Sequence, residues 1–380
     1  MSAEASATSR PGREPALDWL RGLAALAVVM FHYFHKGPME GWMPVRQHPL
    51  LDALSAYGYL GVHLFFMISG YVIMMTAQHA DLRHFVASRI SRLVPALWFC
   101  ATLTALIELL IPESPFKPLS WTQYLANLTL VPAWFGQEPI DGAYWSLAIE
   151  INFYLWVAAA IALGQLRHIE RLLLAWLALS FVNLLRPMYP VQLLTSAHWA
   201  PLFAGGAFFY LVRASGWTRQ RRLALCASLL LACAYAWRET GPLRGWDTLV
   251  RLDAGPNHLV IQAIILACFG AFRWMVSRPL TSSGDALSDL AGRLTYPLYL
   301  IHQNAGYALF GLAASGGLVA VLGPGFVTLL IIGMALAAAW FVNVVVEQRL
   351  GPALRRWVAG TRPPLVAWSP PHSSTSRERP

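Results

Sequence analysis

The chain has 380 residues, of which 57% are hydrophobic and 12% are charged, and its formal net charge is +9. Soluble globular domains contain about 25% charged residues, so this composition excludes an ordinary soluble domain and predicts an integral membrane protein. No run of Lys and Arg is interleaved with aromatic residues as in a nucleic-acid-binding groove, and we therefore expect no nucleic-acid partner.

Ten apolar segments predict an all-α, polytopic fold of about ten transmembrane helices. They cover approximately residues 17–36, 57–78, 93–112, 143–163, 171–186, 194–213, 222–238, 258–276, 293–313 and 325–346. The amphipathic, proline-broken stretch 119–135 is expected to be interfacial or re-entrant. Residues 17–357 would form the transmembrane domain, between disordered cytoplasmic ends at 1–16 and 358–380. No small-residue cleavage site follows the first segment, so we expect a retained membrane helix.

The distribution of arginine predicts the orientation of these segments. Placing the N-terminus in the cytoplasm assigns most loop arginines to the cytoplasmic side, such as Arg219, Arg221 and Arg222 after the sixth segment. Cytoplasmic loops of membrane proteins carry an excess of Lys and Arg. With an even number of spans, both termini are predicted to be cytoplasmic.

The first apolar segment, Leu17 to His35, contains several ionisable residues, which is unusual for a membrane span. An ionisable side chain inside a bilayer costs several kcal/mol unless it is paired or faces a polar cavity. Arg21 and His32 are separated by about three helical turns, or ~16 Å along the axis, and therefore share one face. This spacing predicts a polar path along the helix.

A carboxyl group is expected at a depth similar to that of His32. Glu150 lies ~10 Å inside the segment 143–163, and His32 lies ~6 Å inside the first segment. A carboxylate beside an imidazole would orient the ring and raise its basicity; alternatively, Glu150 is a structural partner of an Arg or Trp. The pair His32 and His35 has no third ligand in register, so we expect no metal.

Two further groups of residues have two possible interpretations each. Tyr296, Tyr299 and His302 share one helical face, and His302 either lines a substrate cavity or is a hydrogen-bonded core histidine. Arg89 and Arg92 are three residues apart. They either bind phosphates, which suit bidentate arginine hydrogen bonds, or reflect only the charge bias of cytoplasmic loops.

Six segments, in order, resemble the acyltransferase 3 family of integral membrane acyltransferases. They are LDWLRGLAALAVVMFHYFH, GYLGVHLFFMISGYVI, FVASRISRLVPALW, AYWSLAIEINFYL, TYPLYLIHQ and VVVEQRLGPALRR. The resemblance covers about 17–357 and implies O-acylation of lipopolysaccharide, exopolysaccharide or related glycans. No SGNH-type esterase domain follows, so the stand-alone form of the family is expected.

The resemblance also implies roles for individual residues. Arg21 and His32 match the family's Arg-x10-His, in which the histidine is catalytic. Arg89 and Arg92 match its R-x-x-R, which is implicated in donor binding. Glu150 matches the acid of its WSLxxE motif.

The late motifs match less completely. Tyr296, Tyr299 and His302 match the family's S/T-Y-x-x-Y-L-x-H and are expected to bind substrate. Glu347 matches a late acid, but the proline of the family's E-R-P pattern is absent. His63 stands where many members carry Asp. The roles of Glu347 and His63 therefore stay open.

We thus predict an enzyme that moves an acyl group, usually acetyl in this family, from cytoplasmic acyl-CoA to a carbohydrate or glycolipid hydroxyl. The acceptor would lie at the outer face of the inner (plasma) membrane, among membrane lipid. Arg89 and Arg92, together with Arg21, would bind the CoA phosphates. His32, oriented by Glu150, would act as general base or as nucleophile.

Three alternatives are open. A transporter would use His32, Glu150 and His302 as a proton relay, but no large inverted repeat of the kind found in transporters is visible. A non-catalytic sensor or scaffold would not bind CoA. An acyltransferase with a macrolide, lipid or peptidoglycan acceptor would differ in its outer loops, at 36–56, 113–142 and 239–257.

Overall fold

The computed structural model describes residues 14–43, 49–78, 80–111, 114–116, 119–240, 257–278 and 286–360. Within these ranges the chain is helical and has no β-strand, which confirms the predicted fold class. The α-helices are α1 (Pro15–Phe31), α2 (Gly37–Met39), α3 (Pro49–Ser55), α4 (Gly61–Ala77), α5 (Leu82–Leu110), α6 (Trp121–Asn127), α7 (Trp145–Ala162), α8 (Ile169–Leu185), α9 (Tyr189–Thr195), α10 (Ala200–Ser215), α11 (Arg219–Thr240), α12 (His258–Val276), α13 (Ala286–Ile301), α14 (Gln303–Ser315), α15 (Leu318–Leu322), α16 (Pro324–Phe341) and α17 (Gln348–Ala359).

Seven helical stretches among the described residues are long and apolar enough to cross a membrane. They are Pro15–Met39, Leu50–Ala77, Leu82–Leu110, Gly142–Ala162, Leu166–Leu185, His258–Val276 and Pro324–Ala359. Such stretches are expected of a multi-pass membrane protein, because about 20 apolar helical residues span the hydrocarbon core. The total of ten spans and the cytoplasmic placement of both termini stay predictions.

Helix α5 starts well before the predicted segment 93–112, at Leu82. Its N-cap is Asp81, whose side chain accepts a hydrogen bond from the backbone N–H of His84 at 2.8 Å. An aspartate at this position satisfies a backbone donor that the helix cannot. The apolar pattern missed the first turns because they carry Arg89 and Arg92, which therefore lie within the helix.

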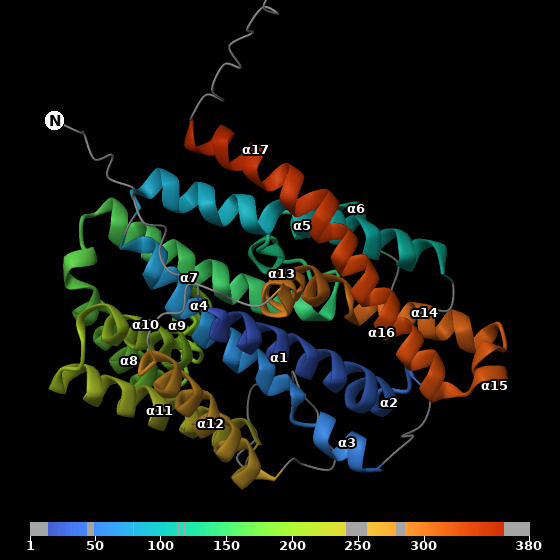
Figure 1. Cartoon of the computed structure of the whole chain (residues 1–380), viewed down its shortest axis with the longest axis horizontal. Helices are drawn as coiled ribbons and strands as arrows, with labels where there is room; N and C mark the ends of the chain where they lie inside the picture. The colour runs from blue at the N-terminus through green and yellow to red at the C-terminus, as the bar shows by residue number, and fades with distance from the viewer. Residues whose placement is uncertain are drawn as a thin grey trace, which may run out of the picture.

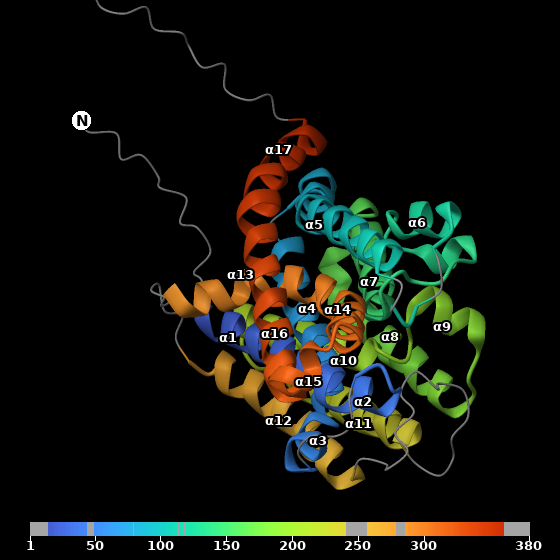
Figure 2. The same ribbon diagram turned by 90° about the vertical axis from the view of Figure 1, so that its right-hand side faces the viewer.

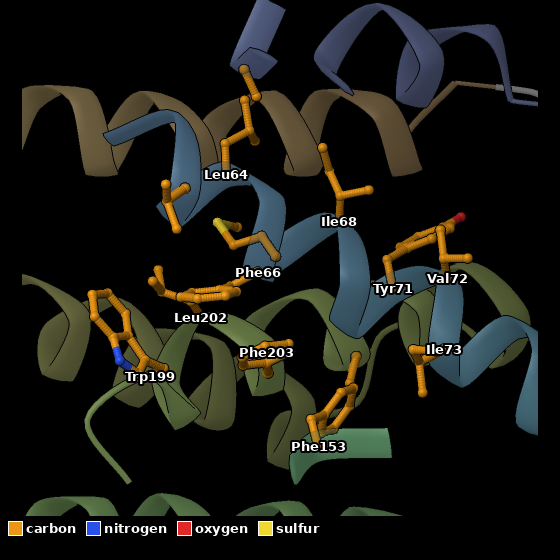
Figure 3. Packing of buried hydrophobic residues seen from close by; sticks show 14 of the residues in the cluster. Leu64, Phe66, Ile68, Tyr71, Val72, Ile73, Phe153, Trp199, Leu202 and Phe203 are labelled. Carbon is orange, nitrogen blue, oxygen red and sulfur yellow. The ribbon is translucent and has the colours of Figure 1, made fainter. Parts of the chain in front are cut away.

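The largest hydrophobic cluster surrounds the contact between α4 and α10 (Figure 3). Phe203 of α10 is fully buried, and its ring centroid lies 4.8 Å from that of Phe66 and 4.7 Å from that of Phe153. Such aromatic pairs stabilise a core beyond the area that they bury. The cluster fixes α4 and α7, which carry Ser69 and Glu150.

Helix α1 packs against α13 and α4, and Figure 2 shows it toward one side of the bundle, with α4 nearer the centre (Figures 1 and 2). The π-helical segment η6 (Val342–Glu347) joins α16 to α17, and α17 runs beside α5 (Figure 1). This arrangement brings the first, third, ninth and tenth predicted spans together. These four segments carry most of the predicted site residues.

The predicted disordered ends lie largely outside the described residues, which begin at 14 and end at 360. Helix α1 begins at Pro15 and α17 ends at Ala359, so the helical part is slightly longer at both ends than the predicted domain 17–357. The stretch 119–135 contains α6 and a short 3-10 turn, η3 (Pro132–Phe135). Most of the predicted outer loop 239–257 also lies outside the described residues.

Candidate active site

Two buried histidines from distant parts of the sequence meet inside the bundle. His32 follows α1 and begins the π-helical turn η1 (His32–Lys36), and His302 occupies the break between α13 and α14. Nε2 of His302 lies 3.1 Å from Nδ1 of His32. The sequence analysis identified both histidines as site residues but did not predict that they pair.

Hydrogen bonds to carbonyl oxygens determine which nitrogen of each neutral ring carries the proton. A carbonyl only accepts, so a ring nitrogen that bonds to one must be protonated. Nδ1 of His32 lies 2.8 Å from O of Val28, and Nδ1 of His302 lies 3.1 and 3.0 Å from O of Leu298 and Tyr299. Nε2 of His302 therefore accepts from Nδ1–H of His32. Nε2 of His32 makes no hydrogen bond to a described residue and keeps its lone pair.

Glu150 occupies a different position from the one expected. Its Oε1 accepts hydrogen bonds from the hydroxyls of Ser69, at 2.6 Å, and Tyr154. Among the described residues His302, not Glu150, is the side chain that hydrogen-bonds to His32. Equal depth gives the position of a residue along the membrane normal but not its position around the bundle. Glu150 lies on α7, which packs against α4 and α5, whereas α13, which His302 follows, packs beside α1.

Arg89 presents a buried guanidinium that is only partly satisfied. Its Nη2 donates to Oγ of Ser88 at 2.8 Å, whereas Nε and Nη1 are buried without a partner. The guanidinium lies 5.9 Å from the ring centroid of Phe85 and 5.8 Å from that of Tyr154. A buried cation with unpaired N–H groups is costly unless an anion binds to it.

Two adjoining cavities place the three predicted arginines together. The larger cavity has a volume of about 520 Å³ and the smaller about 80 Å³. Four residues line both of them: Arg21, Val72, Arg92 and Tyr296. Arg89 lines the smaller cavity, which continues to Glu150 and Tyr299. The predicted R-x-x-R pair and Arg21 therefore share one space, which Glu347 borders at the larger cavity.

The predicted tyrosine face of α13 connects these cavities to the histidine pair. Tyr296 donates to O of Leu93 at 3.0 Å, and Tyr299 donates to O of Ala143 at 2.8 Å. The ring centroid of Tyr299 lies 5.9 Å from that of His302. Neither histidine lines the two cavities, and Tyr299, which lines the smaller (inner) cavity, is the residue through which that cavity adjoins the pair.

A buried polar network beside the histidines was missed by the sequence analysis. Asp141 is fully buried, and its carboxylate accepts from the backbone N–H groups of Ala143 and Asn304 at 2.8 and 2.9 Å. Burial raises the pKa of Asp141 to about 7. The Asn304 side chain also donates to Glu108 at 2.9 Å. The only sequence signal was an Asp before a helix start, which resembles an ordinary N-cap.

The remaining noted residues lie elsewhere. His63 packs between the rings of Tyr59 and Trp199, at centroid distances of 5.9 and 5.4 Å. His35 pairs with Asp52 at 2.7 Å. Neither residue lines the two cavities, and their roles stay open.

Comparison with known proteins identifies a family model that covers most of the chain. The model, described as an acyltransferase domain (acyltransferase 3), matches residues 14–344. Acyltransferase MdmB from Streptomyces mycarofaciens is 24% identical in a gapped alignment 392 residues long, which includes 93% of this chain and 94% of that protein. No solved structure gives a significant match.

Two further relatives match a smaller part of the chain. O-acetyltransferase OatA from Staphylococcus aureus (strain NCTC 8325 / PS 47) is 31% identical over 160 residues, 37% of this chain and 23% of that protein. Peptidoglycan O-acetyltransferase OatA from Listeria monocytogenes serovar 1/2a (strain ATCC BAA-679 / EGD-e) is 27% identical over 169 residues, 39% of this chain and 24% of that protein. The chain thus spans about a quarter of each OatA protein.

Proposed function

Because the chain belongs to the acyltransferase 3 family and is therefore a multi-pass membrane acyltransferase, we propose that it transfers an acetyl group from acetyl-CoA to a carbohydrate hydroxyl. The donor enters from the cytoplasm and the acceptor lies at the outer face of the inner (plasma) membrane. Cytoplasmic acyl-CoA is accessible only from that membrane. The names of the two OatA relatives support O-acetylation, and the Listeria name supports a glycan acceptor.

The observation that carries the proposal is the pair of adjoining cavities that contain the three predicted arginines and reach Tyr299, the neighbour of His302. Coenzyme A has an anionic nucleotide end and a thin arm that ends in the thioester. Three arginines and four carboxylates line the larger cavity. Arg21 pairs there with Asp18, and Arg293 with Asp289, so Arg92 is the arginine that would bind the nucleotide end. The unpaired N–H groups of Arg89 suit a phosphate at the inner cavity. The arm would then extend past Tyr299 toward His32.

The free Nε2 of His32 supplies the base in this scheme. It takes the proton of the acceptor hydroxyl while the hydroxyl oxygen attacks the thioester carbonyl. The carbon–sulfur bond breaks, and the CoA thiolate leaves and takes the proton from Nε2. In the second version of the scheme, Nε2 attacks the thioester carbonyl, the carbon–sulfur bond breaks and the CoA thiolate leaves, which gives an acyl-histidine. The acceptor hydroxyl then attacks the acyl group, the bond from that group to Nε2 breaks, and the hydroxyl proton passes to the CoA thiolate. Both versions require Nε2 of His32 unprotonated.

Glu150 has a different role in this proposal from the one expected from its depth. Its hydrogen bonds to Ser69 and Tyr154 place the carboxylate at the inner cavity with Arg89. There it would balance the charge of Arg89 and shape the passage for the donor arm. Tyr296 and Tyr299 line the same passage.

The experiment is a transfer assay on the purified full-length protein in detergent, with radiolabelled acetyl-CoA and a panel of bacterial glycans. Wild type should bind CoA saturably and label at least one glycan. His32→Ala should bind CoA normally and transfer nothing. His84→Ala, which changes an exposed histidine at the start of α5, should behave as wild type. Transfer by His32→Ala, or no CoA binding by wild type, would refute the proposal.

A further inference from the structure

We infer that His302 is a positioning residue for His32, and that Tyr33 and Tyr307 hold the two histidines against each other. The inference rests on the proposed function, because it takes His32 as the reacting group. It assigns to His302 a hydrogen bond with His32 in place of the predicted contact with substrate.

Crossed tyrosine hydrogen bonds join the two histidine segments. The backbone O of His32 accepts from the hydroxyl of Tyr307 at 3.0 Å. The backbone O of His302 accepts from the hydroxyl of Tyr33. Each histidine is therefore bonded to a tyrosine of the other segment. Both segments are irregular, since His32 begins a π-helical turn and His302 interrupts the helix, and π-helical turns are frequent at functional sites.

Two glycines permit the crossing. A Cβ on Gly306 would lie 2.1 Å from the hydroxyl oxygen of Tyr33. A Cβ on Gly37 would lie 2.8 Å from Cε1 of Tyr307 and 2.8 Å from O of His32. Both tyrosines thus contact a glycine of the opposite segment at a separation that no other residue allows. The two rings are fully buried, so neither hydroxyl has water as a ready substitute partner.

The chemical consequence concerns the charge that forms on His32. When Nε2 takes a proton or an acyl group, the ring becomes cationic, and its Nδ1–H donates more strongly. His302 uses its own Nδ1–H on the carbonyls of Leu298 and Tyr299, so its Nε2 can only accept from His32. This is the arrangement of a base and its orienting partner, with an imidazole held by two carbonyls as the partner.

Substitution of His302 by leucine and by glutamine tests this assignment. Leucine removes the acceptor, and the glutamine amide oxygen can replace Nε2 as an acceptor for Nδ1–H of His32. We expect His302→Leu to lower kcat about a hundredfold, with KM for acetyl-CoA within about twofold. The loss should be smaller than the ~10⁴-fold loss seen when removal of an orienting partner gives the wrong tautomer, because O of Val28 still holds the proton on Nδ1 of His32. His302→Gln should recover kcat to within about tenfold of wild type. A residue that contacted substrate would change KM instead.

Three results would overturn the inference: full activity of His302→Leu, equal loss in both variants, or a change confined to KM. If His302→Leu does not fold, Tyr307→Phe gives the answer, because it removes one oxygen only. It should lower kcat roughly threefold to tenfold, as expected for one neutral hydrogen bond, at unchanged KM. Wild-type kcat in both Tyr307→Phe and Tyr33→Phe would count against the crossed pair.

A spectroscopic measurement separates this inference from the proposed function. In protein labelled with ¹⁵N-histidine, the ring nitrogen shifts report which nitrogen of His32 is protonated, and His32→Ala assigns the signals. Wild type should show His32 protonated at Nδ1. In His302→Leu the carbonyl of Val28 still accepts from that Nδ1–H, so the tautomer should persist, but the Nδ1 signal should shift because the second acceptor, Nε2 of His302, is lost. If wild type transfers no acetyl group, the proposed function fails, and the spectrum then decides whether His302 positions His32. An unchanged His32 signal in His302→Leu would overturn the positioning role.

Discussion

Replacement of Arg89 by leucine should weaken CoA binding and leave the empty protein at least as stable. Nε and Nη1 of Arg89 are buried without hydrogen-bond partners, so leucine removes two costly unsatisfied donors from the apo state. Each charge-assisted hydrogen bond to a phosphate contributes about 1.5–3 kcal/mol. Two such bonds give about 3–6 kcal/mol, which corresponds to about 10²- to 10⁴-fold in Kd.

Arg221 provides the matched control, because it is equally buried but fully hydrogen-bonded. Its Nη1 donates to O of Leu211 and Gly216 at 2.9 and 2.7 Å, and its Nη2 donates to Glu170 at 2.6 Å. Breaking a buried ion pair costs about 3–5 kcal/mol; the cost here is at the lower end because Glu170 is partly exposed. Arg221→Leu should therefore lower the unfolding temperature and leave the Kd for CoA unchanged.

The assays are isothermal titration with CoA and thermal unfolding followed by tryptophan fluorescence, both on detergent-purified protein. Arg89→Lys adds a third comparison, since lysine keeps the charge but not the planar fork, and should bind CoA more tightly than leucine and less tightly than arginine. Our account of Arg89 is refuted if Arg89→Leu binds CoA like wild type, or if it is destabilised as strongly as Arg221→Leu.

Three further predictions follow from the contacts of single residues. Glu150→Gln should raise KM for acetyl-CoA more than it lowers kcat, because Glu150 bonds to Ser69 and Tyr154 rather than to His32; steady-state kinetics with varied donor would show the reverse if Glu150 orients the base. The stability of Asp141→Asn relative to wild type should increase as pH rises from 6 to 8, because wild type loses stability over this range. The pKa of Asp141 is raised to about 7 in the folded protein, so the folded state favours the protonated carboxyl, and that contribution is lost as pH passes through this value; equal unfolding temperatures of the two proteins across this range would contradict it. Phe203→Ala should cost about 3–5 kcal/mol, because the ring is fully buried between Phe66 and Phe153; thermal unfolding that matches wild type would mean that the cluster is not a stabilising core.

Local sequence was sufficient to predict the class of fold and to select most of the candidate site residues. A membrane-spanning helix must contain a long apolar stretch, which is visible without knowledge of its neighbours. Ionisable residues in such stretches are costly, so Arg21, His32 and Glu150 were identifiable one by one. The spacing of Arg89, Arg92 and His302 left two interpretations open, and the family motifs favoured a binding role for them. The structure places the three arginines around adjoining cavities.

The hydrogen-bond partners of the site residues and the ends of the helices were less predictable, because they depend on which helices pack together. Depth along a helix gives a height in the membrane but no direction around the bundle, and so Glu150 was expected beside His32 but bonds to Ser69. Asp141 was indistinguishable from a helix cap until its contact with Asn304 was known. The start of α5 was misplaced because the arginines of its first turns broke the apolar pattern.

The amino-acid sequence by itself determined the helical membrane class and the acyltransferase 3 resemblance, and it singled out His32 as the proposed reactive histidine. Only the tertiary structure decided what surrounds that histidine. His32 and His302 are 270 residues apart and meet because α1 packs along α13. The proton on Nδ1 of His32, and hence the lone pair on Nε2, is fixed by that packing and by the carbonyl of Val28. Such a pairing depends on helix rotation and crossing, which no periodicity within one segment can specify.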